Sequence, residues 1–328
     1  MTAMINSDIR TQRREQIMNL VDWLGITIVA VVLFILFSFM SSQFYSHNNL
    51  MNIIKQVSIV AVLSIGMTCV FLIGGMDLSA GSNMFLSAVL LAVLLQNHVN
   101  VWIAMLVSIG ACLLTGTLNG IIIERLSINC VIVTLGSQLL IRGIAQVVIE
   151  KYNSWIYVKN PVTKYINTGK PVLGIPTLFF VIFVLYIFAY LMLHYTSFGR
   201  RIYAVGGNPR AAVLCGFENI KIKTICYTIS GIASAIAGII AACRLGMVNP
   251  SVGSGYEFDA VTAVVLGGMS LKGGEGSVIK TLVGALIVAM ISNFMTLYGV
   301  DANFKDCVTG LFILMAVLFN RFTQHQDQ

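Results

Sequence analysis

The chain has 328 residues, of which 57% are hydrophobic and only 10% are charged, and its formal net charge is +7. Water-soluble domains carry roughly 25% charged residues, so this composition excludes a soluble globular fold and leaves no room for a soluble catalytic domain. The Lys and Arg residues lie between apolar runs and do not gather on one face, which argues against nucleic acid as a partner.

Apolar runs of membrane-spanning length recur along the whole chain. A helix that crosses the hydrocarbon core of roughly 30 Å needs about 20 mostly apolar residues. The sequence therefore predicts an all-α polytopic membrane protein, a single transmembrane domain over residues 1–328 with about ten transmembrane helices. The expected spans are 20–40, 52–73, 78–97, 101–123, 129–150, 175–195, 223–243, 255–270, 276–298 and 304–320. The span 255–270 is the weakest, since Glu257, Asp259 and the glycines Gly267 and Gly268 leave it short and interrupted.

The distribution of basic residues predicts the orientation. A polar tail, residues 1–19, precedes the first apolar run, which is too long for the core of a signal peptide and should remain as an anchor. Among the polar segments between the spans, those on the same side of the membrane as this tail contain more Lys and Arg than those on the opposite side. This bias favours both termini in the cytoplasm. Residues 197–222 then lie inside and residues 151–174 outside. Four lysines in that outer segment run against the bias, and a docking surface for a partner is an alternative reading of it.

Cysteine and histidine give no sign of a metal site. The seven cysteines are scattered, mostly within apolar runs, and have no paired spacing, so we interpret them as small buried hydrophobic residues. The four histidines lack a metal-ligand spacing such as H-E-x-x-H, and the chain has no G-x-S-x-G elbow. A membrane-embedded enzyme is therefore disfavoured.

Two glycine-rich segments resemble each other. Residues 74–82 read Gly-Gly-Met-Asp-Leu-Ser-Ala-Gly-Ser, and residues 267–277 read Gly-Gly-Met-Ser-Leu-Lys-Gly-Gly-Glu-Gly-Ser. Each follows one apolar run and precedes another. A weaker similarity follows later in the chain, since Asn119 lies 17 residues before Gly136 and Asn293 lies 17 residues before Gly310. With five spans in each half, the second half would enter the membrane inverted, as in many transporters. Chance similarity between glycine-rich turns is the alternative.

These segments also suggest where a substrate passes. A helix broken at membrane depth exposes N–H and C=O groups, which is tolerable only where they face protein or a polar cavity. Asp77 in such a break is costly and is therefore a functional candidate; capping of the third helix by its carboxylate is a second, compatible role. The residues that we expect along the substrate path are Gly74, Gly75, Asp77, Ser79, Asn119, Gly267, Gly268 and Asn293.

A polar, basic segment at residues 198–217 separates the sixth and seventh spans. Asn208 could cap a short helix that has Pro209 at its first position, and Gly216 could end it. A helix of about two turns along the inner face of the membrane would fit a groove on a cytoplasmic partner. A merely solvated basic loop is the alternative.

The pattern of this segment, Gly-Arg-x-x-x-Ala-x-Gly-Gly-Asn-x-x-Ala-Ala-x-x-x-Gly, closely resembles the ATPase-contacting loop of the ribose/arabinose/galactose-type ABC permeases. Residues 74–81 are similar to their Gly-Gly-x-Asp-Leu-Ser-x-Gly signature, and residues 265–274 to their second signature. The resemblance extends over about residues 50–320. It implies that the coupling helix to the ATPase involves Gly199, Arg200, Gly207, Asn208, Ala211, Ala212 and Gly216. Ser270 stands at the position that corresponds to Asp77, so a carboxylate role is not duplicated.

The resemblance also implies partners and a substrate class. The chain would be the permease subunit of an importer in the bacterial inner membrane, with a separate ABC ATPase inside and a periplasmic sugar-binding protein outside. A second permease copy, an identical chain rather than a paralogue, would complete the pore. The substrate would be a monosaccharide such as ribose, allose, another pentose or hexose, or a related furanone signal.

Other functions stay open at this point. The permeases for branched-chain amino acids have a similar loop, and an ion-driven secondary transporter could use Asp77, Arg142, Glu257 and Asp259 as ion sites. The sequence has no Walker A motif, Gly-x-x-x-x-Gly-Lys-[Ser/Thr]. ATP hydrolysis, with its bound Mg-ATP, must therefore come from another polypeptide, and we expect no cofactor on this chain.

Overall fold

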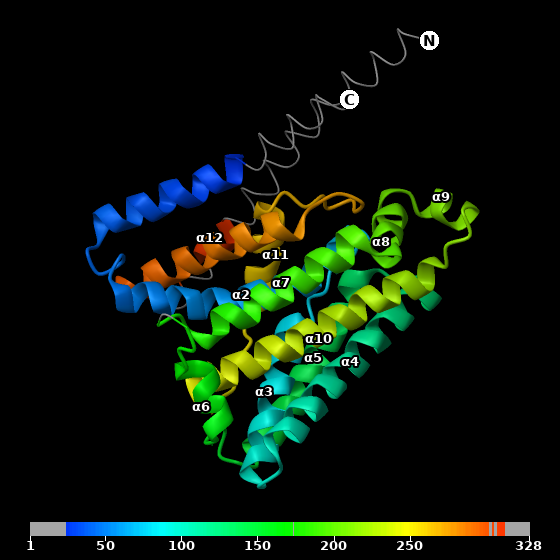
Figure 1. The fold of residues 1–328 in the computed structure, drawn as a ribbon. Coiled ribbons are helices and arrows are strands. Elements are labelled where there is room, and N and C mark those ends of the chain that lie inside the picture. The colour runs from blue at the N-terminus through cyan, green and yellow to red at the C-terminus, as the bar shows by residue number, and fades with distance from the viewer. Residues whose placement is uncertain (1–23, 173, 302–303, 305–306, 312–328) are drawn as a thin grey trace.

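A computed structural model describes residues 24–172, 174–301, 304 and 307–311 (Figure 1). The predicted tail 1–19 and most of the predicted span 304–320 lie outside these residues. The described helices are Leu24–Met40, α2 (His47–Leu72), α3 (Ala80–Gln96), α4 (Val101–Leu126), α5 (Cys130–Glu150), α6 (Pro161–Thr168), α7 (Thr177–Tyr195), α8 (Ser197–Gly207), α9 (Pro209–Leu214), α10 (Asn219–Leu245), α11 (Tyr256–Leu266) and α12 (Val278–Leu297). Two short strands, β1 (Ile156–Tyr157) and β2 (Met247–Val248), pair in antiparallel orientation.

The described chain confirms an all-α polytopic membrane protein. By length and composition, α2, α4, α5, α7, α10 and α12 are long and apolar enough to cross a membrane, whereas α3 and the helix Leu24–Met40 are shorter apolar helices. The weak span at 255–270 is indeed short, because α11 has only 11 residues. The total of ten spans stays a prediction.

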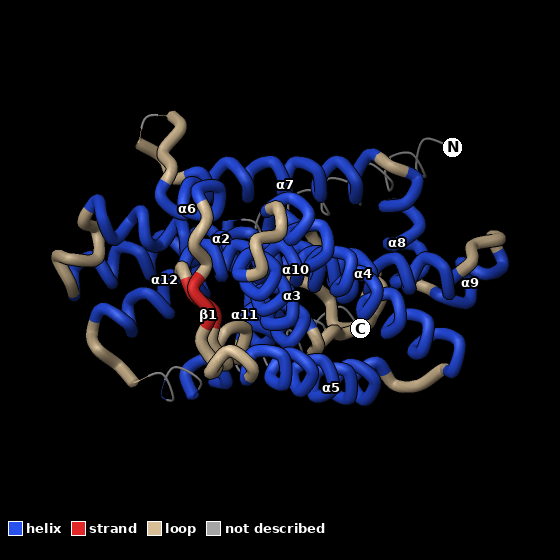
Figure 2. The backbone as a smooth tube through the Cα atoms, turned by 90° about the horizontal axis from the view of Figure 1, so that it is seen from below, coloured by secondary structure: helices blue, strands red, loops and turns tan. Residues whose placement is uncertain are grey.

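Helices α2 and α10 form the centre of the bundle. In their most apolar stretches 83% of the α2 residues and 72% of the α10 residues are buried, against only 22% in α5. Figure 2 shows α10 and α3 in the middle, with α7 and α5 at opposite edges. The outer helices expose large apolar side chains such as Leu106, Leu139 and Phe188. An exposed apolar surface of this extent suits lipid rather than water.

Glycines let the neighbours of α10 approach its backbone. A Cβ atom on Gly231 would overlap the carbonyl oxygen of Cys112 in α4, and one on Gly116 would overlap the carbonyl oxygen of Tyr227. On the other side of α10, a Cβ atom on Gly66 of α2 would lie 2.7 Å from the Cα atom of Ser230. Close approach through small residues is the usual way in which membrane helices associate.

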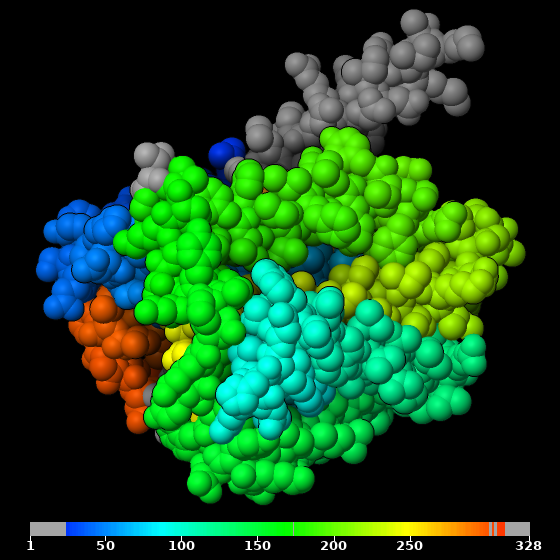
Figure 3. All heavy atoms as spheres, turned by 60° about the horizontal axis from the view of Figure 1, so that its bottom comes forward, coloured from blue at the N-terminus to red at the C-terminus, as the bar shows by residue number. Residues whose placement is uncertain are grey.

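The two long polar segments lie at opposite ends of the bundle (Figure 1). In residues 151–174, the outer loop, Asn167 Nδ2 donates to the carbonyl oxygen of Arg244 at the C-terminal end of α10, at 3.0 Å. In residues 197–222, the coupling segment, Pro209 accepts through its carbonyl oxygen from Asn219 Nδ2 at the N-terminal end of α10, at 2.9 Å. Figure 3 brings the end of the bundle that carries the outer loop toward the viewer and shows this loop against the end of α3.

The sequence reading missed α6, α8 and the β1–β2 pair. These elements are short and lie in polar segments, so no long apolar run marks them. The prediction that the cysteines are buried is confirmed for Cys69, Cys112, Cys226 and Cys243. It is wrong for Cys215 and Cys307, which are exposed, and Cys130 is half-buried.

The α4–α10 contact gives a stability prediction. Gly231→Ala should destabilise the protein by about 1–3 kcal/mol, because the added methyl group has to push α4 away. Gly110→Ala is the matched control, since a Cβ atom on Gly110 in the same α4 helix meets no atom within 4 Å. Thermal unfolding in detergent measures the difference. Equal unfolding midpoints for the two variants would show that this contact is not tight.

Candidate functional site

The first glycine-rich segment ends α2 and turns the chain back into the protein. Gly74 has a φ of +72°, and its N–H bonds to the carbonyl oxygen of Phe71 at 2.8 Å while that of Gly75 bonds to Val70 at 2.9 Å. This pair of bonds is a Schellman cap, which needs a left-handed residue and favours glycine. The irregular backbone that follows is surrounded by protein, because Asp77 and Ser79 are fully buried.

Asp77 fixes this break to α10. One carboxylate oxygen accepts from the N–H and the hydroxyl of Ser79, at 3.0 and 2.6 Å, and the other accepts from the hydroxyl of Ser230 in α10, at 2.6 Å. The predicted capping role is only partly right. Ser79, not Asp77, is the N-cap residue of α3, and its side chain makes no capping bond. Asp77 therefore mainly ties two helices together.

A chain of hydrogen bonds extends from Asp77 across three more helices. The hydroxyl of Ser79 accepts from Asn119 Nδ2 in α4 at 3.0 Å and from Asn83 Nδ2 in α3 at 3.3 Å. Asn119 in turn accepts from the hydroxyl of Ser137 in α5, and Asn83 accepts from that of Thr115 at 2.6 Å. We call this set the polar cluster; its members are Asp77, Ser79, Asn83, Thr115, Asn119, Ser137 and Ser230.

The polar cluster joins three residues that the sequence had singled out. Asp77, Ser79 and Asn119 are brought together by hydrogen bonds, and their role in a substrate path stays a prediction. Asn83, Thr115, Ser137 and Ser230 were missed, because a single small polar residue inside an apolar run gives no local signal. Their position on facing helices would have been the only clue.

A second buried carboxylate lies near this cluster, at the start of α11. Glu257 is 4% exposed, and its Oε1 atom accepts from Gln138 Nε2 in α5 at 3.0 Å. A Cβ atom on Gly81, in the first turn of α3, would overlap this carboxylate. The N-terminal ends of α3 and α11 therefore meet inside the bundle, and their dipoles favour negative charge there. In transporters with broken helices, such ends line the substrate path.

The second glycine-rich segment ends α11 with the same type of cap. Gly268 has a φ of +76°, and the N–H groups of Gly268 and Met269 bond back to Val265 and Val264 at 2.9 and 3.3 Å. However, the left-handed residue is the second glycine of this pair, whereas Gly74 is the first of its own. The two Gly-Gly-Met motifs are thus shifted by one position, and the inverted repeat stays a prediction.

The remaining predicted path residues lie elsewhere. Gly267 packs against Thr281 in α12, where a Cβ atom would come within 2.9 Å of its backbone. Asn293 exchanges two side-chain hydrogen bonds with Asn49, at 2.9 and 3.0 Å. Asn49 lies in the first turn of α2, at the opposite end of this helix from Gly74, so Asn293 does not join the polar cluster.

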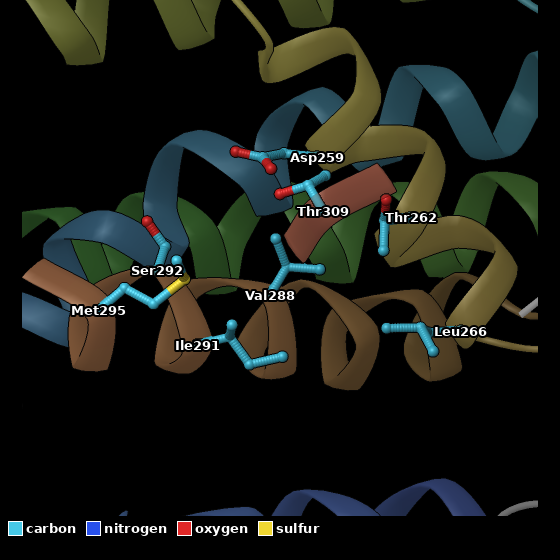
Figure 4. A pocket seen from close by; sticks show the side chains of 8 residues that line it. All are labelled: Asp259, Thr262, Leu266, Val288, Ile291, Ser292, Met295 and Thr309. Carbon is cyan, nitrogen blue, oxygen red and sulfur yellow. The ribbon is translucent and has the colours of Figure 1, made fainter. Parts of the chain in front are cut away.

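A separate crevice lies between α11 and α12 (Figure 4). Polar side chains of Asp259, Thr262, Ser292 and Thr309 line it together with apolar ones. Asp259, Ser292 and Thr309 point into the same space (Figure 4). The sequence had marked Asp259 only as a possible ion site.

The coupling segment forms the short helix that its residues predict. Asn208 Oδ1 accepts from the N–H of Ala211 at 3.0 Å, Pro209 takes the first position of α9, and Gly216 follows its end with a φ of +81°. Ala212 is buried, whereas Leu214 is 88% exposed. Helix α9 therefore rests on the protein by one side and presents an apolar side chain on the other.

The other coupling residues lie in α8, which precedes α9. Thr196 caps this helix by accepting from the N–H of Gly199, at 3.2 Å. A Cβ atom on Gly199 would overlap the carbonyl oxygen of Leu193 in α7. Arg200 is exposed, as are Gly207 and Ala211. The predicted coupling residues therefore lie in one region at the end of the bundle, where Gly199 and Ala212 are buried and the others are exposed.

Broken helices around buried carboxylates are a feature of polytopic membrane transporters. Residues 49–317 match the family described as branched-chain amino acid transport system / permease component. The chain belongs to this family, which is a family of transport components rather than enzymes.

Several curated relatives are similar over almost their whole length. The chain is 37% identical over 299 residues to the ribose import permease protein RbsC of Escherichia coli (strain K12), covering 90% of this chain and 93% of the relative. It is 35% identical over 317 residues to RbsC of Bacillus subtilis (strain 168), with 94% and 96% covered. It is 33% identical over 304 residues to the L-arabinose transport system permease protein AraH of Escherichia coli (strain K12), with 92% of each chain covered. No solved structure matches the chain significantly.

The contacts of Asp77 predict a graded effect of substitution. Asp77→Leu should strongly lower thermal stability, because it leaves the buried hydroxyls of Ser79 and Ser230 without this acceptor, at about 1–3 kcal/mol each. Asp77→Asn keeps the oxygen that faces Ser79, and the Ser230 hydroxyl can turn to accept from the new amide. The loss of thermal stability should therefore be smaller in Asp77→Asn than in Asp77→Leu. Unfolding midpoints in detergent give the order. If the Leu variant were as stable as the Asn variant, these bonds would contribute little.

Proposed function

We propose that this chain is the transmembrane permease subunit of an ATP-binding-cassette importer that carries a monosaccharide across the bacterial inner membrane. Ribose is the first candidate, and other pentoses or hexoses, allose and a related furanone signal belong to the same proposal. The whole chain, residues 1–328, acts as one permease domain. ATP is hydrolysed by a separate ATPase subunit.

The observation that carries this proposal is the coupling segment. Helix α9 is capped at both ends, protrudes from one end of the bundle and exposes Leu214, which suits a groove on a partner protein. The similar proteins suggest the substrate class, since they are named as ribose import and L-arabinose transport permeases. Together these features favour an ATP-driven sugar importer over an ion-driven transporter.

The proposed orientation places the coupling segment and both termini in the cytoplasm and the outer loop in the periplasm. The positions of α6 and α9 at opposite ends of the bundle support this arrangement (Figure 1). The outer loop exposes Trp155, Tyr157 and Tyr165 beside its lysines. Exposed aromatic side chains are enriched in protein–protein interfaces, which suits the docking of a periplasmic sugar-binding protein.

The polar cluster and the adjacent Glu257 are the proposed lining of the sugar path within each subunit. Hydroxyl, amide and carboxylate groups are the partners that sugar hydroxyls bind, and polar groups within a membrane domain are costly to bury and often mark a substrate pathway. One chain supplies one coupling helix, whereas the ATPase domains of such importers work as a pair. A second copy related by a two-fold axis supplies the other helix, as closed symmetry favours.

The test is reconstitution in liposomes with ATP inside. Uptake of radiolabelled ribose, arabinose and leucine is measured while the ATPase subunit and the binding protein are added in turn. We expect sugar uptake only with ATP and both partners, unchanged by a protonophore, and no uptake of leucine. Uptake by the permease alone, driven by a proton or sodium gradient, would contradict the proposal and favour a secondary transporter.

A charge on α9 should block transport without harming the fold. Ala211 is exposed in the first turn of α9, so Ala211→Glu should insert into the membrane normally. A charge that meets no complementary group is strongly disfavoured in an interface, and we expect uptake to fall at least tenfold. Ala211→Ser is the control for side-chain size and should transport normally. Persistent uptake in the Glu variant, at equal amounts of protein, would exclude α9 from the ATPase contact.

A further inference from the structure

Three glycine pairs that are far apart in the sequence meet at the cytoplasmic end of the bundle. They are Gly74–Gly75 after α2, Gly206–Gly207 at the end of α8, and Gly273–Gly274 in the loop between α11 and α12. We call the meeting point of Leu72 and these three pairs the glycine junction. It connects the coupling segment to both glycine-rich segments.

The contacts within the glycine junction are between backbone atoms. The N–H of Gly274 donates to the carbonyl oxygen of Leu72 at 2.8 Å, which satisfies a carbonyl that the end of α2 would otherwise leave open. A Cβ atom on Gly206 would overlap this same carbonyl oxygen and would lie 2.6 Å from the nitrogen of Gly274. A Cβ atom on Gly273 would lie 2.6 Å from the nitrogen of Gly74. Any side chain at these positions would hold the three segments apart.

Tyr203 adds a side-chain tie to the same loop. Its hydroxyl, on α8, donates to the carbonyl oxygen of Gly276 at 3.0 Å. Burial raises the pKa of Tyr203 to about 12, so the hydroxyl keeps its proton at physiological pH and remains a donor. Tyr203 thus connects the coupling segment to the residues that directly precede α12.

We propose that the glycine junction passes movements of α8 and α9 directly to the end of α2 and to the loop between α11 and α12. Tyr203 and Gly206 are then positioning residues for transport, because they hold α8 against these two segments. The inference rests on the proposed function in one respect, namely that α9 contacts the ATPase.

The physical reason lies in the stiffness of backbone contacts. Side chains in contact can absorb a small displacement by changing rotamer, whereas packed backbone groups have no such freedom. A shift of α8 must therefore displace Leu72 and Gly274 together. The segment after Leu72 leads within a few residues to Asp77, and the loop before Gly274 follows α11, which has Glu257 in its first turn. Asp77 is thus connected to the glycine junction by a short stretch of chain, and Glu257 by helix α11 and the loop that follows it.

Two variants of α8 and one control test this in the reconstituted importer, with sugar uptake and ATP hydrolysis measured in the same vesicles. Gly110→Ala in α4 is the control, because it is the same type of substitution outside the junction and the coupling segment and a Cβ atom there meets no atom within 4 Å, so its uptake per ATP should equal that of the wild type. Tyr203→Phe keeps the ring and loses one hydrogen bond. Its uptake per ATP should fall by roughly two- to tenfold, the range expected for one such bond, while ATP hydrolysis continues. Uptake per ATP should fall further in Gly206→Ala, because the added methyl group would overlap the carbonyl oxygen of Leu72.

The outcomes separate the two proposals. If the wild type takes up no sugar with ATP and both partners, the proposed function fails, and the junction as a transmission element fails with it. If the wild type transports and Tyr203→Phe has the same uptake per ATP, only the glycine junction is overturned. Gly206→Ala could fail to fold, and Tyr203→Phe then decides alone. Hydrogen exchange gives a second readout: nucleotide-bound ATPase should change protection at residues 72–76 and 270–276 in the wild type, and less in Tyr203→Phe.

Discussion

The structure depends on one constraint, that the backbone N–H and C=O groups at the ends of its interrupted helices must find hydrogen-bond partners. At the ends of α2 and α11, Schellman caps with left-handed glycines satisfy most of these groups. At Leu72 the partner comes from a remote segment, since Gly274 donates to its carbonyl oxygen. The glycines of both segments are therefore required by hydrogen bonding and close approach, before any function is considered.

These helix ends also place charge inside the bundle. Because the chain turns back after α2, helix α3 begins beside α10, where Asp77 receives hydrogen bonds from Ser79 and Ser230. Helix α11 begins next to α3, with Glu257 at the contact. A buried carboxylate costs several kcal/mol unless it is hydrogen-bonded. The caps, the polar cluster and the short helices are thus consequences of the same breaks.

Features encoded by neighbouring residues could be predicted, and features made by remote residues could not. Length and apolar character located the long helices, and Asn208, Pro209 and Gly216 gave the ends of α9, because caps are local chemistry. The polar cluster forms only where five segments face one another in the fold, so Asn83 and Ser230 could not be identified from the sequence. Asn293 was grouped with Asp77 through an assumed repeat, yet it pairs with Asn49 at the other end of α2. A shared spacing does not fix a shared place in the fold.

The coupling segment shows how one motif serves packing and function at once. Its glycines differ in their surroundings: Gly199 lies against Leu193, Gly206 lies against Leu72, and Gly207 has room for a side chain. Gly199 and Gly206 are needed to pack α8 against α7 and α2, independently of any role in transport, whereas Gly207 is not needed for packing. Helix α8, which precedes α9, is held by the end of α7 and by the glycine junction. In the proposed transmission, a force applied to α9 would reach the core through the ends of helices rather than through their apolar faces.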